Sequence, residues 1–294
     1  MRILFSGDQY PYSEYALRET IKLAKNTWAD VTLLGIHPAS SAKEAARVAV
    51  WPGELPVSKA VQAYREAFLS GWDKGESPYE VQEGRYEWIR VEDLRWEETK
   101  VLRGSKKDLR VRMRVGNPGR EILAESREDE SDLIVLGCTQ GDRCVWAAST
   151  PVPQEVVNDA LCSVLLVKEE QPVTRILACM DQGYISQESL EMINQMVAIH
   201  GADLELIGLS QNGDLNKAVY TRLIEVGDYY SDRDVNITTR LTDIADFEQF
   251  ISKEIREDLL ALWVGKRSLL NRFFARDWVG RFVSKCQASV LVMR

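Results

Sequence analysis

The sequence contains the same order of segments twice, and this repeat restricts the possible fold more than any other feature. The opening stretch ILFSGDQ (residues 3–9) is matched by ILACMDQ (residues 176–182), with the aspartate at the same point. The same offset relates ADVTLLGIHP (residues 29–38) to ADLELIGLSQ (residues 202–211). Because apolar runs recur at matching places, we infer two units of one architecture within a single chain.

Short runs of Val, Leu and Ile also recur near the end of each copy. SDLIVLG (residues 131–137) is matched by LLALWVG (residues 259–265), and CSVLLV (residues 162–167) by ASVLVM (residues 288–293). Runs of this kind are typical of strands that are buried on both faces of a parallel sheet. Helical patterns separate them, so the sequence predicts right-handed crossovers and an α/β sheet flanked by helices.

We expect two domains, residues 1–170 and residues 171–294. The polar, proline-containing segment KEEQPVTR (residues 168–175) lies between the last strand of one and the first strand of the other.

The first half is the longer one, and its additional residues form an insertion at about residues 40–110. Residues 58–70 have a helical pattern. The stretch RYEWIRVEDLRWEETKVL (residues 85–102) fits neither the helical nor the strand period cleanly, and we interpret it as helical. The insertion is therefore expected to form mostly helices that cover apolar surface beside the first domain.

Composition excludes several classes of protein. The net charge is −8, with 45% hydrophobic and 28% charged residues, which favours a globular protein and argues against nonspecific binding to nucleic acid or acidic membranes. No apolar run is long enough for a membrane helix, and the N-terminus lacks a secretory signal, so we expect a cytoplasmic location. Five cysteines without a C-x-x-C pair argue against a disulfide framework, and two histidines argue against a zinc site.

This order of elements resembles that of a tandem universal stress protein, over nearly the whole chain except the insertion. The matching segments of the first half are ILFSGD (residues 3–8), RVGNPGREIL (residues 114–123), DLIVLG (residues 132–137) and CSVLLV (residues 162–167). The second half matches more loosely, because Thr242-Asp243 replaces the expected Gly-x-Pro turn. The resemblance implies an α/β fold with two open, parallel, five-stranded sheets arranged as an internal pseudo-dimer.

The last strands of the two halves are expected to pair with each other. SVLLV (residues 163–167) and SVLVM (residues 289–293) would each leave an open sheet edge, and an open edge has to be covered. Beyond this internal pairing, the intact chain could also form a homodimer.

The resemblance also implies an ATP site at the carboxyl ends of the strands in those members that bind nucleotide. Their loop carries Gly, two residues, Gly, nine residues, and Gly-Ser or Gly-Thr. Here the loop begins at Gly137, but Gln140 stands at the second glycine and Thr150-Pro151 at the final pair. Pro151 offers neither a hydroxyl nor a backbone N–H, so two donors expected near the phosphates are missing.

Two interpretations of this loop stay open. In the structural one, Thr150 caps the last helix of the domain and Pro151 occupies its first turn. In the other, a shifted phosphate site uses Gly141, Ser149 and Thr150.

The candidate nucleotide-binding residues of the first half are Asp8, Ile36, Gly116, Gly137, Gly141, Ser149 and Thr150. Those of the second half are Asp181 and Gly265. By resemblance, the two aspartates contact the nucleoside side of ATP, although an Asx turn at the strand-to-helix junction explains them equally well. The second half has Ser268 at the second glycine and lacks the final Gly-Ser pair, so it should bind more weakly still.

No arrangement of residues in the sequence supports catalysis or a metal site. We therefore predict a non-enzymatic, cytoplasmic protein of the universal stress type that acts through a protein partner or a small ligand. No cofactor is certain, ATP would bind weakly, and neither nucleic acid nor a membrane is an expected partner. The alternatives are an ATP-binding switch or nucleotide-dependent enzyme that uses the first-half crevice, and a module whose insertion docks a partner.

Overall fold

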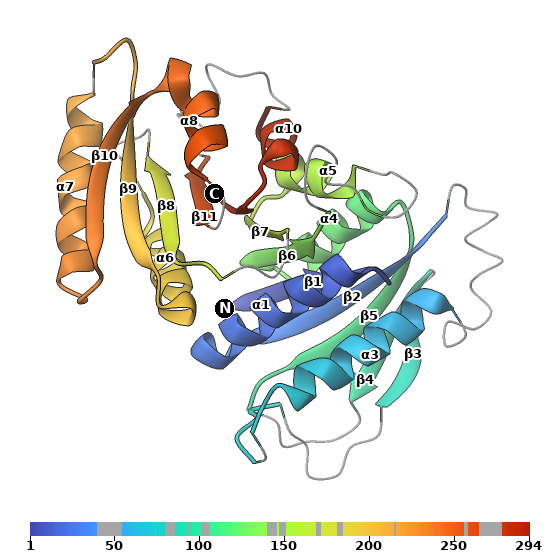
Figure 1. Ribbon diagram of the computed structural model, residues 1–294. Helices are drawn as coiled ribbons and strands as arrows, with labels where there is room; N and C mark the ends of the chain where they lie inside the picture. Colours follow the sequence, from blue (N-terminus) through green and yellow to red (C-terminus); the bar gives the residue numbers. More distant parts are fainter. Residues whose placement is uncertain are drawn as a thin grey trace.

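The computed structural model describes residues 1–39, 55–73, 75–79, 86–92, 94–100, 106–139, 146, 151–168, 172–180, 185–214, 216–255, 258–264 and 278–294. These residues build a twelve-stranded sheet with helices on both faces (Figure 1). The strand order is β10-β9-β8-β11-β12-β7-β6-β1-β2-β5-β4-β3. The predicted α/β fold class is therefore confirmed.

The first half contributes β1 (Arg2–Ser6), α1 (Pro11–Thr27), β2 (Asp30–Pro38), α3 (Pro56–Ser70), β3 (Tyr86–Glu92), β4 (Arg95–Lys100), β5 (Leu109–Gly116), α4 (Pro118–Glu128), β6 (Leu133–Gly137), α5 (Val152–Asp159) and β7 (Ser163–Val167). The second half contributes β8 (Arg175–Met180), α6 (Gln187–His200), β9 (Asp203–Ser210), α7 (Lys217–Ser231), β10 (Ile237–Asp243), the 3₁₀ turn η3 (Ile244–Asp246), α8 (Phe247–Glu254), β11 (Asp258–Trp263), α10 (Trp278–Lys285) and β12 (Ser289–Met293).

Two layers of helices cover the sheet. Side chains of α1, α3, α6 and α7 belong to the core on one face, and those of α4, α5, α8 and α10 to the core on the other. The central strands are almost wholly buried, as the continuous apolar runs predicted. Among the described residues, none of the helices combines the length and the apolar character that crossing a bilayer requires.

The prediction of a helix over residues 85–102 is wrong. Within this stretch, β3 and β4 form an antiparallel hairpin, and β4 continues the sheet by pairing antiparallel with β5. The tryptophans explain the difference, because aromatic residues pack well on a pleated surface. Trp96 is buried in the core, and Trp88 packs against the same core.

The predicted helix of the insertion is present as α3. It lies against β2 so closely that a Cβ added to Gly35 would be 2.3 Å from Cγ2 of Val61. Val61 and Phe68 are part of the core on this face. The insertion thus has one helix and one hairpin among its described residues, and both cover or extend the sheet of the first half.

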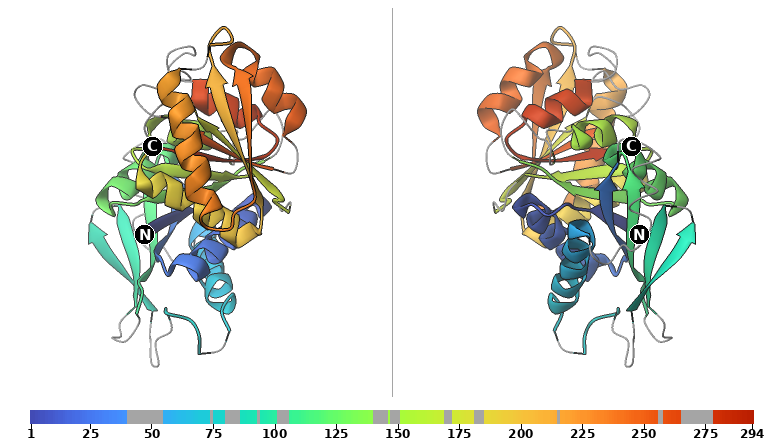
Figure 2. Two further views of the ribbon diagram at one scale, coloured as in Figure 1. Left: turned by 90° about the vertical axis from the view of Figure 1, so that its left-hand side faces the viewer. Right: turned by 90° about the vertical axis from the view of Figure 1, so that its right-hand side faces the viewer.

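The expected pairing of the last strands is present. β12 runs antiparallel to β7, with Leu291 opposite Leu165, whereas the other neighbours within β8–β12 are parallel. The two parallel sets are consequently joined in one sheet rather than being separate. Figure 2 shows most of the second half, in orange and red, above the first half, in blue and green, with the yellow helix α6 beside α1.

Helices also meet across the junction between the halves. Nε2 of His200 lies 3.1 Å from Oε2 of Glu19, which joins α6 to α1. On the opposite face, α10 packs on α5, where the backbone N–H of Gly280 donates to Oδ1 of Asn158 at 2.9 Å. A Cβ at Gly280 would lie 2.7 Å from the carbonyl oxygen of Gln154, so this helix crossing requires a glycine.

This crossing predicts that Gly280→Ala lowers the free energy of unfolding by about 1–3 kcal/mol, because the added methyl group must push two helices apart. The matched control is Gly227→Ala in α7, where a Cβ would have no neighbour within 4 Å. The control should be stabilised by about 0.4–1 kcal/mol. Urea unfolding of both variants measures the difference, and a gain in both would contradict the close contact between α5 and α10.

Candidate functional site

Four of the candidate nucleotide-binding residues lie at the carboxyl ends of neighbouring parallel strands. Asp8, Ile36, Gly116 and Gly137 follow or end β1, β2, β5 and β6, which are neighbours in the order β6-β1-β2-β5. The carboxyl ends of parallel strands form the crevice that ligands use in open α/β sheets. The fold therefore brings these four to one region. Gly141, Ser149, Thr150, Asp181 and Gly265 lie outside the described residues.

The carboxylate of Asp8 is hydrogen-bonded within the chain on both oxygens. Oδ1 accepts from the backbone N–H of Tyr10 at 3.1 Å and from Oγ of Ser13 at 3.1 Å, while Oδ2 accepts from the Tyr12 hydroxyl. The bond from Tyr10, two residues on, is the Asx turn that the sequence offered as an alternative. A ligand hydroxyl that approached Asp8 would have to compete with Tyr12 for the same oxygen.

The inserted helix α3 reaches the same turn. The hydroxyl of Tyr64 donates to the carbonyl oxygen of Asp8, and its ring meets Phe5 edge to face at 5.4 Å between centroids. Burial raises the pKa of the Tyr64 hydroxyl well above its usual range. Tyr64 therefore stays neutral and acts as a donor that fixes the turn.

Gly137 has a structural reason to be glycine. A Cβ at this position would lie 2.2 Å from the carbonyl oxygen of Tyr12, because the start of α1 passes directly across the end of β6. Ile36 is 5% exposed and belongs to the core on the α4 side. Gly116 accepts a hydrogen bond from the backbone N–H of Ala39 at 3.1 Å, which holds the ends of β2 and β5 together.

Two further residues beside Gly137 were not singled out from the sequence. Trp146 is buried, and its indole N–H donates to the carbonyl oxygen of Gly137 at 2.8 Å. Its place in a loop of mixed polarity gave no sign of this contact.

Cys138 is disulfide-bonded. The odd number of cysteines argued against a disulfide framework, but it excludes only a complete pairing, not a single bond. Cys179 and Cys286 are buried thiols, whereas Cys162 is half-buried.

The most extensive polar cluster lies between α4 and the β4–β5 pair. Glu125 on α4 is fully buried, and its carboxylate contacts the guanidinium groups of Arg95, Arg112 and Arg114. The contact from Arg114 to Oε2 measures 2.8 Å and that from Arg95 to Oε1 3.2 Å. We call this group the Glu125 cluster.

Surrounding carboxylates complete the cluster. Glu97, Glu121, Glu128 and Asp129 each contact one or more of its arginines. Burial alone would lower the pKa of Arg112 and Arg114, but Glu125 and the surrounding carboxylates together outweigh this effect and hold both pKa values above the ordinary one. The arginines therefore remain charged, and the cluster is a paired ionic layer.

The spacing of charges in the sequence is the signal that could have predicted this cluster. Arginines alternate at positions 110, 112 and 114, so they share one face of β5. Glu121, Glu125 and Glu128 follow the helical spacing that places them on one face of α4. These two faces are the ones that meet in the fold.

The carboxylates of Asp8 and Glu125 are each held by several donors of the same chain, which makes them structural acceptors rather than bases poised for a substrate. In the described part of the chain, His, Cys, Asp and Glu side chains form no group of three or more that could hold a metal ion.

Comparisons with known proteins agree with this architecture. The model of the universal stress protein family matches residues 1–168. No curated protein matches the chain in sequence. Among solved structures, a universal stress protein from Archaeoglobus fulgidus DSM 4304 superimposes with a TM-score of 0.62 at 16% identity, over 100% of this chain and 96% of that one.

Two other structures share the fold at low identity. A protein of unknown function from Pseudomonas aeruginosa PAO1 has a TM-score of 0.54 at 13% identity, covering 99% of this chain and 92% of that one. The cytoplasmic domain of a prokaryotic cation chloride cotransporter has a TM-score of 0.51 at 11% identity, covering 99% and 94%.

The Glu125 cluster predicts that Glu125→Gln lowers the free energy of unfolding by about 3–5 kcal/mol, because it leaves buried guanidinium groups without their shared counter-charge. The control is Glu130→Gln, which removes a carboxylate that is 79% exposed and 2.7 Å from NH1 of Arg2. Such a solvent-screened surface pair should contribute far less than the buried cluster. Denaturant unfolding compares the two, and equal losses would show that the cluster contributes no more than a surface pair.

Proposed function

Because the chain belongs to the universal stress protein family, as the match over residues 1–168 establishes, we propose that it is a non-enzymatic, cytoplasmic stress-response protein. It acts through a protein partner or a small ligand, and its affinity for ATP is weak or lost. The engagement of Asp8 is the observation that carries this proposal. Both oxygens of the carboxylate that would face a nucleoside already accept hydrogen bonds from Tyr10, Tyr12 and Ser13.

The sequence of the phosphate loop supports the same conclusion. Gln140 and Pro151 stand where a glycine and a donor-bearing serine or threonine would contact the phosphates. A hydrogen bond to a charged group contributes about 1.5–3 kcal/mol. The loss of two such bonds costs about 3–6 kcal/mol, which weakens a micromolar site by about two to four powers of ten.

We further propose that residues 1–170 and residues 171–294 are two domains packed as an internal pseudo-dimer. Support comes from the antiparallel pairing of β7 with β12 and from the helix contacts on both faces of the junction. Since β7 and β12 cover each other, a homodimer of the whole chain would have to use a different surface.

An ATP-binding switch or nucleotide-dependent enzyme is the second candidate. The observation in its favour is the position of Asp8 and Gly137 at the carboxyl ends of two adjacent strands, where open α/β sheets bind ligands. However, the close approach of Tyr12 explains the glycine at position 137 without any ligand.

Titration calorimetry of the full chain with ATP and magnesium tests the two candidates. We expect a dissociation constant of about 100 µM or weaker, which follows from the two to four powers of ten estimated above. A constant in the low micromolar range would contradict the proposal. Asp8→Ala would then locate the site, because Gly137 cannot be enlarged without displacing α1.

A further inference from the structure

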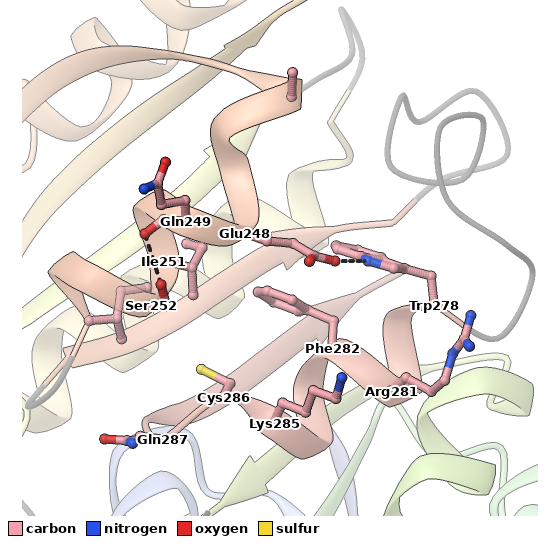
Figure 3. A pocket seen from close by; sticks show the side chains of 12 residues that line it. Glu248, Gln249, Ile251, Ser252, Trp278, Arg281, Phe282, Lys285, Cys286 and Gln287 are labelled. Atoms are coloured by element: carbon pink, nitrogen blue, oxygen red, sulfur yellow. Dashed lines mark hydrogen bonds between the residues drawn. The ribbon is translucent and has the colours of Figure 1, made fainter. Parts of the chain in front are cut away.

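The two halves differ in the space between their last two helices. In the first half, α4 and α5 are in close contact, since a Cβ at Gly119 would lie 2.2 Å from Oε2 of Glu155. The corresponding helices of the second half are α8 and α10, which likewise precede the last two strands. Between them lies a groove of about 860 Å³ (Figure 3). The first half thus serves as an internal comparison in which the same space is closed.

The position of α10 explains the opening. The face of α10 that carries Gly280 packs closely against Gln154 and Asn158 of α5, which belongs to the first half. The groove is lined by another face of α10, on which residues lie three and four positions apart. These residues are Trp278, Arg281, Phe282 and Lys285. At its floor, Nε1 of Trp278 donates to Oε1 of Glu248 on α8 at 2.6 Å.

The groove has an apolar floor. The rings of Trp278 and Phe282 are stacked, with 4.7 Å between centroids and 17° between planes. Ile251 and Ile255 line the groove from the opposite side and are buried, like the two aromatic residues. A ligand that covers this floor must therefore present an apolar surface.

The rim of the groove is cationic. Arg281 and Lys285 are exposed, lie one turn apart on α10, and both line the groove, with Lys285 extending toward Phe282 and Arg281 extending outward beyond Trp278 (Figure 3). The acidic side chain among the described lining residues, Glu248, accepts the hydrogen bond from Trp278. Free phosphate is a poor fit to the groove because it would leave the apolar floor uncovered. A neutral hydrocarbon is also a poor fit because it would not interact with the two cations.

We propose that this groove binds a small organic anion with an apolar body, such as an aliphatic or aromatic carboxylate. Lys285 contacts the anionic group and Arg281 adds positive charge at the same rim, while Phe282 and Ile251 contact the apolar body. The volume is within the range of about 300–1,000 Å³ that is usual for small-molecule sites. This site goes beyond the proposed function, because it is separate from the first-half crevice and does not depend on whether ATP binds there.

Binding of anilinonaphthalene sulfonate, an anionic apolar fluorophore, to the full chain is the first measurement. Its fluorescence should rise with a single-site titration, and decanoate should displace it. Decanol, which has the same chain without the charge, should be the weaker competitor by about twofold to thirtyfold, the range expected for two exposed ionic contacts. The affinity of the fluorophore should also fall as salt is added.

Variants then place the probe in the groove. Arg281→Gln with Lys285→Gln should weaken binding by about twofold to thirtyfold. Ser252→Trp, at an exposed position that lines the groove on α8, should fill the space and abolish binding. The matched control is Lys217→Gln with Lys253→Gln, which removes the same charge from exposed positions outside the groove and should leave the affinity unchanged.

Thermal unfolding of each variant separates loss of binding from loss of fold. Equal displacement by decanol and decanoate would overturn the role of the rim cations. Unchanged affinity of a folded Ser252→Trp variant would overturn the assignment of the probe to the groove. ATP titration of the same variants distinguishes this failure from failure of the proposed function, because the first-half crevice is left intact.

Discussion

The antiparallel contact between β7 and β12 determines how the rest of the molecule is arranged. Each is the last strand of its half, and each consists almost wholly of buried apolar residues. Left open, either edge would expose unpaired backbone donors and acceptors together with apolar side chains. Pairing β7 with β12 satisfies the backbone donors and acceptors, covers the apolar side chains, and produces one continuous sheet. It also brings α5 next to α10 on one face and α1 next to α6 on the other.

The same junction makes the two halves unequal. α10 is held against α5 at Gly280 and contacts α8 through the hydrogen bond from Trp278 to Glu248, and a groove stays open beside this contact. In the first half, α4 is held by the Glu125 cluster and by its contact with α5. A repeated architecture therefore provides two different environments at equivalent places, one closed by the contact between α4 and α5 and one open, with an apolar floor and a cationic rim. The second environment is the one available to a ligand.

Apolar patterns predicted the parts of the fold that burial alone determines. The strands that are buried on both faces, the repeat and the pairing of the last strands could all be read in this way, because continuous Val, Leu and Ile runs have few alternatives. The hairpin formed by β3 and β4 could not, since its charged strands form only by pairing with each other and, through β4, with β5. The Glu125 cluster was missed for a related reason. Its charges resemble a solvated surface until the face of β5 and the face of α4 are known to meet.

Two residues of the candidate nucleotide site have structural reasons of their own. Gly137 is required by the passage of α1 across the end of β6, and Asp8 closes the turn that begins α1. Both residues would be needed for the same local structure whether or not a nucleotide ever bound there. Gln140 and Pro151 stand where the family motif has a glycine and a serine or threonine. Pro151 also has a structural place, because it directly precedes α5 and its carbonyl oxygen accepts from the backbone N–H of Glu155 at 3.0 Å. The glycine and the aspartate that match the motif therefore report on the scaffold and do not by themselves indicate a bound nucleotide.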